Sequence, residues 1–370
     1  MKMEYTTLDK ICENLDSQRK PITSSDRVEG SIPYYGASGV VDYVQDYIFD
    51  ERLLLVSEDG ANLLARSTPI AFSIEGKTWV NNHAHVLRFA DNIKQKYMEL
   101  YLNSISLEPY ITGSAQPKLN QKMLNEIPIP VVDRETMKMV VDAAEQVNQI
   151  ISIRKKELEE LDNLIKARFV ELFGDPMTNS NGYVLKTYGE LFELNAGGTP
   201  SKQKSEYWDN GTISWIGSNM CQNAVIYEND GNYITVEGLN HSSARMFPID
   251  TVLIALVGAT IGKTALLKFE TTTNQNVLGV RGIRESGYTP EFIFYYTQGL
   301  YQKFLNIGDG GFAMASKGFI SELPVPIVEL ELQEQFTAFA HQVDKSKVAV
   351  QKSLDEAQLL FDCLMQKYFG

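Results

Sequence analysis

The sequence is poor in cysteine, in basic charge and in long apolar runs. Its three cysteines, Cys12, Cys221 and Cys363, lie too far apart for a disulfide framework or a closely spaced cysteine metal site. Lysine and arginine number 34 against 47 acidic residues, and the formal net charge of −13 excludes a basic coat that binds nucleic acid through charge alone. No apolar run approaches the roughly 20 residues that span a bilayer, and the first residues contain no apolar signal segment. We therefore expect a cytoplasmic protein that does not enter a membrane.

A repeat divides the chain into two halves. Leu-Asn-Glu-Ile-Pro-Ile-Pro at 124–130 recurs as Ile-Ser-Glu-Leu-Pro-Val-Pro at 320–326, which is an offset of 196 residues. The same offset relates Phe173-Gly174 to Phe369-Gly370. Because internal similarity over this length marks a duplicated unit, we interpret the chain as two tandem halves, 1–174 and 175–370.

The composition of each half changes at a pair of prolines, Pro128 and Pro130 in the first half and Pro324 and Pro326 in the second. Upstream, short runs rich in Tyr, Val, Ile and Leu alternate with Gly, Asn, Asp and Ser, a texture typical of short strands and turns. In the first half the predicted strands are Ile32–Tyr35, Val40–Val44, Leu53–Ser57, Ile70–Ile74 and His83–Phe89. Downstream, neither Pro nor Gly interrupts the chain before the closing Phe-Gly, so one long helix is predicted in each half. The expected fold class is α+β.

The second long helix has apolar residues at heptad spacing, at Val350, Leu354, Ala357, Phe361, Leu364 and Tyr368. The equivalent first-half positions are Arg154, Leu158, Leu161, Ile165, Arg168 and Leu172, where the two arginines weaken the seam. We expect the helices, each about 60 Å long, to pack as an antiparallel coiled coil in a pseudo-twofold object. Such a spacer suits two domains that read two half-sites on one DNA duplex. Periodicity alone equally allows a duplicated protein whose helices only oligomerise.

Short motifs follow one another in order along both halves. The first half contains Ile-Pro-Tyr-Tyr-Gly-Ala-Ser-Gly (32–39), Ser-Glu-Asp-Gly-Ala (57–61), Asn-Asn-His-Ala-His (81–85) and Gly-Ser-Ala-Gln-Pro-Lys-Leu-Asn (113–120). The second contains Gly-Gly-Thr-Pro-Ser (197–201), Ile-Ser-Trp-Ile (213–216), Ile-Gly-Lys-Thr-Ala (261–265) and Asn-Gln-Asn (274–276). Together these motifs resemble two classes of target recognition domain in the specificity subunits of type I restriction-modification enzymes, over essentially the whole chain.

The resemblance implies a non-catalytic DNA reader without a cofactor of its own. It implies mixed α/β target recognition domains at 1–130 and 175–325 and conserved helices at 131–174 and 326–370. Two adenine-N6 methyltransferase subunits carrying S-adenosylmethionine, and nuclease-translocase subunits, would be the partners at a bipartite, asymmetric target. The chain itself lacks the Asn/Asp-Pro-Pro-aromatic motif of such methyltransferases. The helix residues assigned to partner binding are Leu158, Leu161, Ile165, Leu172, Leu354, Phe361, Leu364 and Tyr368.

Polar side chains, most of them within these motifs, are the candidate DNA contacts, since amides pair bidentately with adenine and lysine reaches phosphate or guanine. In the first half they are Tyr35, Ser38, Asn81, Asn82, His83, Gln116 and Lys118. In the second half they are Thr199, Ser201, Thr260, Lys263, Asn274, Gln275, Asn276 and Lys317. The alternatives stay open: amides beside glycine also build turns, and aromatic residues such as Tyr35 also fill cores.

Two patterns point weakly to other chemistry. His83 and His85 alternate on a predicted strand and would share one face, but further ligands at suitable spacing are missing, so packing is favoured over a metal site. Gly258–Thr264 resembles a phosphate loop with three instead of four residues between its glycines, which argues against a nucleotide-dependent enzyme. We expect a strand-ended loop there, with Thr260 and Lys263 facing DNA phosphate or plain solvent.

The net charge of −13 conflicts with strong DNA binding by the chain alone, because affinity for DNA depends on neutralised phosphates. We expect weak binding alone and tight, specific binding in complex with the methyltransferase subunits. The alternative is an acidic assembly scaffold or a DNA-mimicking anti-restriction protein. Acidic side chains grouped at DNA-phosphate spacing on one surface would favour that alternative.

Overall fold

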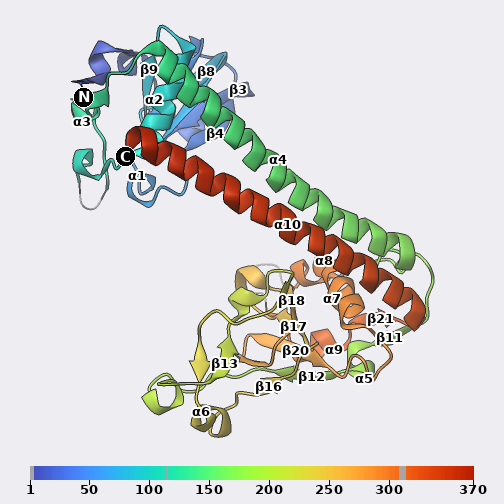
Figure 1. The fold of residues 1–370 in the computed structure, drawn as a ribbon. Coiled ribbons are helices and arrows are strands. Elements are labelled where there is room, and N and C mark those ends of the chain that lie inside the picture. The colour runs from blue at the N-terminus through green and yellow to red at the C-terminus, as the bar shows by residue number, and fades with distance from the viewer. Residues whose placement is uncertain (1–3, 114–115, 308–313) are drawn as a thin grey trace. The chain divides into compact units, whose positions relative to one another are not determined.

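The computed structural model describes residues 4–113, 116–307 and 314–370 (Figure 1). Internal contacts group the chain into unit 1, Met1–Lys156 with Gln351–Gly370, and unit 2, Glu157–Val350. Each unit therefore combines one mixed α/β half with one end of each long helix. The division into four segments stays a prediction, since grouping by contacts follows the packing of the helices and not their sequence limits.

Unit 1 contains two four-stranded sheets and a short ladder. The first sheet has the order β2-β9-β6-β7, formed by Glu13–Asn14, Ala84–Arg88, Leu53–Ser57 and Ala71–Ile74. The second has the order β4-β3-β8-β5, formed by Gly39–Val44, Glu29–Gly36, Lys77–Val80 and Phe49–Asp50, with β3 and β8 parallel. The ladder pairs β1 (Tyr5–Thr6) with β10 (Ile129–Pro130). The five strands predicted from composition are confirmed as β3, β4, β6, β7 and β9.

The core of unit 1 explains its most apolar strand. Leu53 and Leu55 of β6 join one hydrophobic cluster, whereas Leu54 and Val56 join another, so both faces of the strand are buried. A strand buried on both faces reads as a continuous apolar run. Helices α1 (Asn62–Ala65), α2 (Asn92–Ser104) and α3 (Gln121–Glu126) complete the unit, and the Asp91 carboxylate caps α2 by accepting from the Ile93 amide at 2.7 Å.

Unit 2 contains a five-stranded sheet, a four-stranded sheet and a ladder. The first has the order β12-β20-β17-β18-β14, formed by Glu193–Ala196, Val277–Arg281, Val252–Ala255, Thr264–Leu267 and Ala224–Ile226. The second has the order β15-β13-β19-β16, formed by Tyr233–Ile234, Ile213–Ile216, Thr271–Thr273 and Met246–Phe247. The ladder pairs β11 (Leu185–Thr187) with β21 (Pro324–Pro326). The helices are α5 (Tyr188–Leu191), α6 (Val236–Asn240), α7 (Pro290–Gly299), α8 (Tyr301–Leu305) and α9 (Lys317–Ser321).

The two units repeat one topology. Without the added edge strand β14, the order β12-β20-β17-β18 matches β2-β9-β6-β7, and β15-β13-β19-β16 matches β4-β3-β8-β5. The match includes the parallel pair, β13 with β19 in unit 2 and β3 with β8 in unit 1. Strand pairing thus supports the repeat found in the sequence, although the two halves differ in most of their residues.

Two 40-residue helices, α4 (Arg134–Phe173) and α10 (Leu330–Phe369), confirm the long helices and keep the offset of 196 residues at both ends. In unit 1, Val147 and Ile151 of α4 pack with Ala357 and Phe361 near the end of α10. In unit 2, Lys347 of α10 contacts Asp162 of α4 at 2.6 Å, and the earlier Phe339 of α10 contacts the later Arg168 of α4, whose guanidinium lies 5.8 Å from the ring centre. Within each unit the two helix segments are therefore antiparallel. Among the described helices, none combines the length and apolarity needed to cross a membrane.

Candidate nucleic-acid interface

The predicted DNA contacts of the first half lie on neighbouring loops at one end of unit 1. The amide of Asn81 donates to the carbonyl of Tyr35 at 3.0 Å, which joins the β8–β9 turn to the end of β3. The Ser57 hydroxyl donates to the Ala37 carbonyl at 2.5 Å, which brings the β3–β4 turn and Ser38 beside them. The segment 117–119 contacts the segment after β6, because the amide of Leu119 donates to the Glu58 carbonyl at 2.7 Å. Gln116 and Lys118, both exposed, are next to this junction.

Asn81 and Asn274 build equivalent turns. The Asn81 side-chain oxygen accepts from the His83 amide at 2.8 Å, and the Asn274 side-chain oxygen accepts from the Asn276 amide at 3.0 Å. Both three-residue turns join equivalent strands, β8 to β9 and β19 to β20. These two amides are therefore used within the fold, as the turn interpretation allows. The middle residues, Asn82 and Gln275, are exposed.

The predicted contacts of the second half gather around that turn of unit 2. The Thr199 hydroxyl donates to the Gln275 side-chain oxygen at 2.6 Å, and the Leu256 amide donates to the Asn276 carbonyl at 2.8 Å. Exposed Ser201 follows Thr199, and its carbonyl accepts from the Trp208 ring nitrogen at 3.2 Å. Thr199, Gln275 and the loop after β17 thus share one end of the unit.

The loop that resembles a phosphate loop leads from one strand to another. A 3-10 turn, Gly258–Thr260, follows β17, and strand β18 begins at Thr264. A nucleotide-binding loop of this kind opens a helix instead, so the expected strand-ended loop is confirmed. The Lys263 ammonium lies 3.0 Å from the Gln222 side-chain oxygen, and the half-buried Thr260 hydroxyl donates to the Val257 carbonyl at 3.4 Å.

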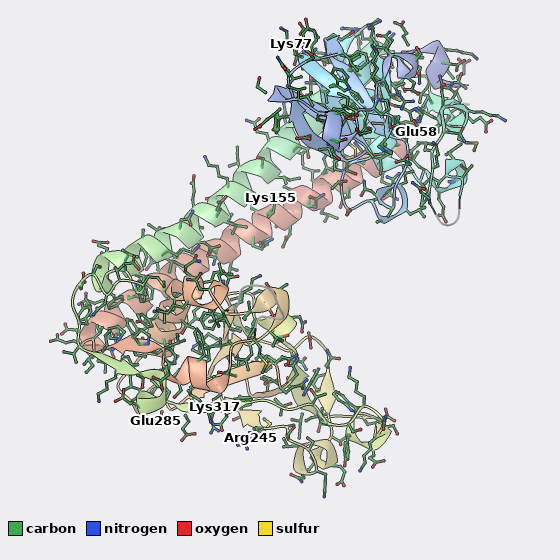
Figure 2. The ribbon with its side chains drawn as sticks, turned by 180° about the vertical axis from the view of Figure 1, so that it is seen from behind. Glu58, Lys77, Lys155, Arg245, Glu285 and Lys317 are labelled. Carbon is green, nitrogen blue, oxygen red and sulfur yellow. The ribbon has the colours of Figure 1, made fainter. Side chains whose placement is uncertain are left out.

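A basic hollow of about 510 Å³ lies beside these loops. Exposed Lys317 from the start of α9 and exposed Arg245 line it, and Figure 2 shows their side chains near one another. None of its other lining residues is acidic: Asn195, Ala196, Gly197, Ser242, Ser243 and Ala244. Sequence reasoning missed Arg245, because an isolated arginine outside a motif carries no local signal. The hollow offers two cations to a phosphate group.

A buried network of charges lies under the loops of unit 1. The Arg19 guanidinium donates to Glu58 at 2.7 Å and to the Ala84 carbonyl at 2.7 Å, and it lies 3.5 Å from Asp16. The His85 ring contacts Asp16 at 2.6 Å and the Leu119 carbonyl at 2.7 Å. Burial alone would raise the pKa of both carboxyls. Bonds and charges from His85 and Arg19, with Lys118 at Glu58, lower both pKa values instead.

The structure separates the two histidines that were predicted to share a face. His85 on β9 is buried, whereas His83 lies in the preceding turn, exposed, 2.9 Å from Asp59. Ligand atoms of Asp16, Glu58 and His85 come within 4.8 Å of one another, which a metal ion could in principle use. Both ring nitrogens of His85 already lie within hydrogen-bond distance of an oxygen, Asp16 at 2.6 Å and the Leu119 carbonyl at 2.7 Å, so neither is open toward a metal ion. Arg19 already supplies positive charge at both carboxylates, and these residues therefore do not fit a metal.

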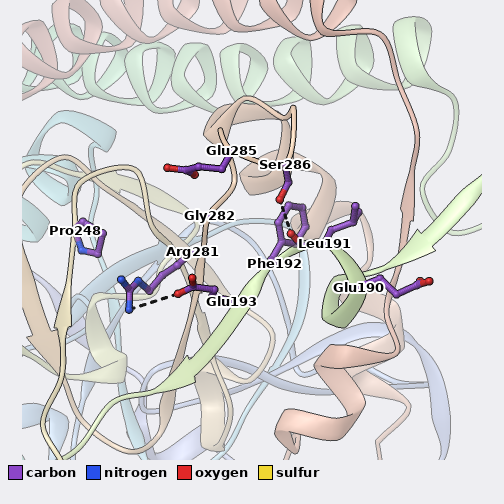
Figure 3. A pocket seen from close by; sticks show the side chains of 9 residues that line it. All are labelled: Glu190, Leu191, Phe192, Glu193, Pro248, Arg281, Gly282, Glu285 and Ser286. Atoms are coloured by element: carbon purple, nitrogen blue, oxygen red, sulfur yellow. Dashed lines mark hydrogen bonds and ion pairs between the residues drawn. The ribbon is translucent and has the colours of Figure 1, made fainter.

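A second hollow in unit 2, of about 410 Å³, is acidic in character (Figure 3). Glu190, Glu193 and Glu285 line it, and its one cation, Arg281, lies 3.9 Å from Glu193. The carboxylates would repel DNA phosphate. This hollow is therefore not part of the candidate interface.

The helix residues assigned to partner binding pack largely inside the chain itself. Ile165 is buried in the core of unit 2, and Leu161 and Leu172 pack against that core. In unit 1, Leu354 and Phe361 pack between the helices and Tyr368 packs against the main core. Leu158 and Leu364 are half-buried. Exposed large apolar side chains on the same helices, outside the set assigned to partner binding, are Met139, Ile150, Ile153, Leu164, Val170, Leu330, Val348, Leu359 and Leu360.

Comparison with known proteins identifies the family. The model of the type I restriction modification DNA specificity domain matches residues 1–163 and again residues 181–357. The chain belongs to this family. The repeated match agrees with the repeated topology and confirms the resemblance read from the motifs. Nothing in these comparisons supports an acidic scaffold or a DNA mimic.

Specificity subunits are also among the relatives found by sequence and by structure. The chain is 28% identical over 195 residues to the EcoR124I/EcoR124II specificity subunit of Escherichia coli, and 35% identical over 130 residues to a Haemophilus influenzae protein provisionally named a specificity subunit. These matches cover 50% and 35% of the chain but only 47% and 33% of the relatives. The S subunit from M. genitalium shares the fold at a TM-score of 0.61 and 14% identity, with 100% of this chain and 96% of that one covered.

Proposed function

We propose that this chain is the DNA-reading subunit of a type I restriction-modification complex in the cytoplasm. Each unit reads one half of a bipartite, asymmetric target through the loops that surround its central turn. The long helices pair as an antiparallel coiled coil that separates the two recognition domains. Two adenine-N6 methyltransferase subunits bind them, and nuclease-translocase subunits complete the complex. The chain itself catalyses nothing and holds no cofactor, because S-adenosylmethionine is carried by the methyltransferases.

One observation carries this proposal: the two units present different side chains on the same scaffold. The central turn is Asn81-Asn82-His83 in unit 1 and Asn274-Gln275-Asn276 in unit 2. The bridge between the neighbouring loops is formed by Asp59 with Lys118 in unit 1 and by Val257 with Met314 in unit 2. Different side chains at equivalent positions select different base pairs. The two half-sites of the target are therefore different in sequence.

The net charge of the chain determines which subunits contact the DNA phosphates and which subunit selects the sequence. A chain of net charge −13 neutralises few phosphates, and its cations are local, as in the hollow of Arg245 and Lys317. The partner methyltransferases therefore supply most of the phosphate contacts, and this chain supplies the choice of sequence. Specific binding of the isolated chain at physiological salt would contradict this division.

The experiment is co-expression with the methyltransferase subunit of the same restriction-modification system, followed by single-molecule sequencing of N6-methyladenine on a plasmid. We expect methylation at one split, non-palindromic motif, and only when this chain is present. Asn82→Ala is expected to relax the motif in one half and Gln275→Ala in the other. An unsplit motif, or methylation without this chain, would refute the proposal. Variant Tyr47→Ala, an exposed residue of unit 1 outside these loops, is the matched control.

A further inference from the structure

The buried charges of unit 1 connect segments that are far apart in the sequence. Arg19 binds the side chain of Glu58 and the carbonyl of Ala84, and His85 binds Asp16 and the carbonyl of Leu119. The Asp16 carboxylate also accepts from the amide of Val86 at 2.9 Å. We call the four side chains Asp16, Arg19, Glu58 and His85 the Asp16 network. This network connects three candidate DNA-contacting segments: the one that contains Glu58, the turn that ends before Ala84, and residues 117–119.

The Asp16 network is largely shielded from water. Its side chains are exposed by only 12% at Arg19, 9% at Asp16, 12% at Glu58 and 1% at His85. A buried charge pair is weak evidence for stability, because desolvation cancels much of the attraction between the charges. A contribution to folding alone is thus a poor explanation for four ionisable groups in this place.

In unit 2, the positions that correspond to Glu58 and His85 are occupied by uncharged side chains. In unit 1, His85 is opposite Val56 in the ladder, and the Glu58 carbonyl accepts from the Leu119 amide. In unit 2 the corresponding pairs are Leu278 with Ile254, and the Leu256 carbonyl with the Ala315 amide. His85 and Glu58 therefore correspond to Leu278 and Leu256, both buried leucines. The scaffold folds with apolar side chains at these positions.

The Asp16 network differs from the leucines in what it holds at the surface. Glu58 Oε1 lies 3.1 Å from the Lys118 ammonium, and Lys118 is 49% exposed at the candidate interface. The Arg19 guanidinium, which donates to Glu58 at 2.7 Å, also donates to the Asn82 carbonyl at 3.5 Å, so the side chains of the Asp16 network link Lys118 to the Asn81–His83 turn. The residue that corresponds to Lys118 in unit 2 is Met314, which bears no charge for an acidic partner to hold.

We propose that the Asp16 network positions Lys118 and the Asn81–His83 turn for DNA, and so determines the half-site that unit 1 reads. Glu58 and His85 are positioning residues, acting through Lys118 and the turn without touching DNA themselves. This inference rests on the proposed function. It goes further in assigning sequence choice in one half of the target to buried side chains under the loops.

The test copies unit 2 into unit 1. Glu58→Leu with His85→Leu removes the carboxylate and the imidazole, leaves Arg19 3.5 Å from Asp16, and installs the leucines found at the equivalent positions. In the complete complex, assayed by single-molecule mapping of N6-methyladenine, we expect methylation of the wild-type motif to fall by roughly tenfold. We expect the positions of the first half-site to become degenerate while the second half-site stays unchanged. The melting temperature is expected to stay within a few degrees of the wild type.

Three further variants make the result decisive. Lys118→Met should relax the same positions, and adding it to the double variant should have little further effect, because both act through one contact. Glu58→Gln should give a partial loss, since an amide keeps the shape but not the charge. Arg52→Leu with Glu75→Leu, an exposed ion pair of the same unit with a distance of 2.9 Å, is the charge-neutral control and should change nothing.

Each outcome supports or overturns the inference. If the double variant methylates the wild-type motif at the wild-type rate, or loses both half-sites together, the Asp16 network does not determine the first half-site. A change of motif caused by EDTA or by added Zn²⁺ would assign these residues to a metal and overturn it equally. If the wild-type complex itself methylates no split motif, the proposed function is refuted. The wild-type sample alone shows this, so the two failures are distinguishable.

Discussion

Unit 1 and unit 2 have the same strand order but opposite chemistry beneath their candidate DNA-contacting loops. The Asp16 network fills that space in unit 1, and Leu256 and Leu278 fill it in unit 2. Both units meanwhile keep a central strand buried on both faces, β6 and β17, and the same Asx turn at the tip. The comparison teaches that the strands specify the fold, whereas the layer between strands and loops can change without changing it.

The largest effect on stability is expected from placing a charge at one of the buried leucines of unit 2. Leu256→Glu puts a carboxylate at a position that is only 4% exposed and lies within the apolar core cluster of unit 2. We expect a loss of about 3–5 kcal/mol in the free energy of unfolding, because an unpaired buried charge keeps its desolvation cost. Urea unfolding followed by the fluorescence of Trp208 and Trp215, whose rings pack 5.3 Å apart in unit 2, measures it. Leu256→Met is the control and should cost under about 1.5 kcal/mol.

Removing one member of the Asp16 network in unit 1 is expected to cost somewhat less free energy of unfolding. Arg19→Ala leaves Asp16 and Glu58 buried together with the His85 imidazole as their remaining buried partner. We expect about 2–3 kcal/mol of destabilisation, discounted because the Arg19 side chain is still 12% exposed. Trp79, the tryptophan of unit 1, reports it in urea. A cost equal to that of Glu58→Leu with His85→Leu would show that pairing within the Asp16 network is irrelevant.

Acid should distinguish the two versions further. The folded-state pKa values of Asp16 and Glu58 lie below the ordinary carboxyl values of 3.8 and 4.5. The stabilisation from these two groups is therefore present above the ordinary values and is lost as the pH falls through the lowered ones. We expect unit 1 of the wild type to lose stability below about pH 4.5, and Glu58→Leu with His85→Leu to lose less. Thermal unfolding read by Trp79 between pH 7 and pH 3 checks this. Identical pH profiles would contradict it.

The smallest effect should be equal in the two units. Asn81→Ala and Asn274→Ala each remove the side-chain oxygen that accepts from the amide two residues later. Loss of such a bond in a turn is worth about 1 kcal/mol. Thermal unfolding should show the same small shift for both variants, and methylation mapping should show each affecting its own half-site. A clear inequality in stability would mean that the two turns are not equivalent.

Much of the architecture could be predicted because it is encoded locally. A proline pair followed by about 40 residues without Pro or Gly is enough to limit α4 and α10, and the repeat offset survives unchanged in their ends. The apolar run of β6 likewise announces a strand, since each residue needs only its neighbours to show the pattern. The order of motifs was sufficient to indicate the family.

Contacts between distant residues were beyond such reasoning. The sequence placed His83 and His85 together, but the strand begins at Ala84, so that one ring is exposed and the other buried. Nor did any local pattern reveal that Asn81 is used within its own turn while Asn82 stays exposed.

The linear chain therefore determined the elements, their duplication and the family, since periodicity and punctuation act over a few residues. Only the tertiary structure decided which side chains meet under the loops. Asp16, Glu58 and His85 come together because β2, β6 and β9 pair in one sheet, and the equivalence of Glu58 with Leu256 follows from strand register. Register depends on packing across the whole sheet, and no short stretch of sequence carries that information.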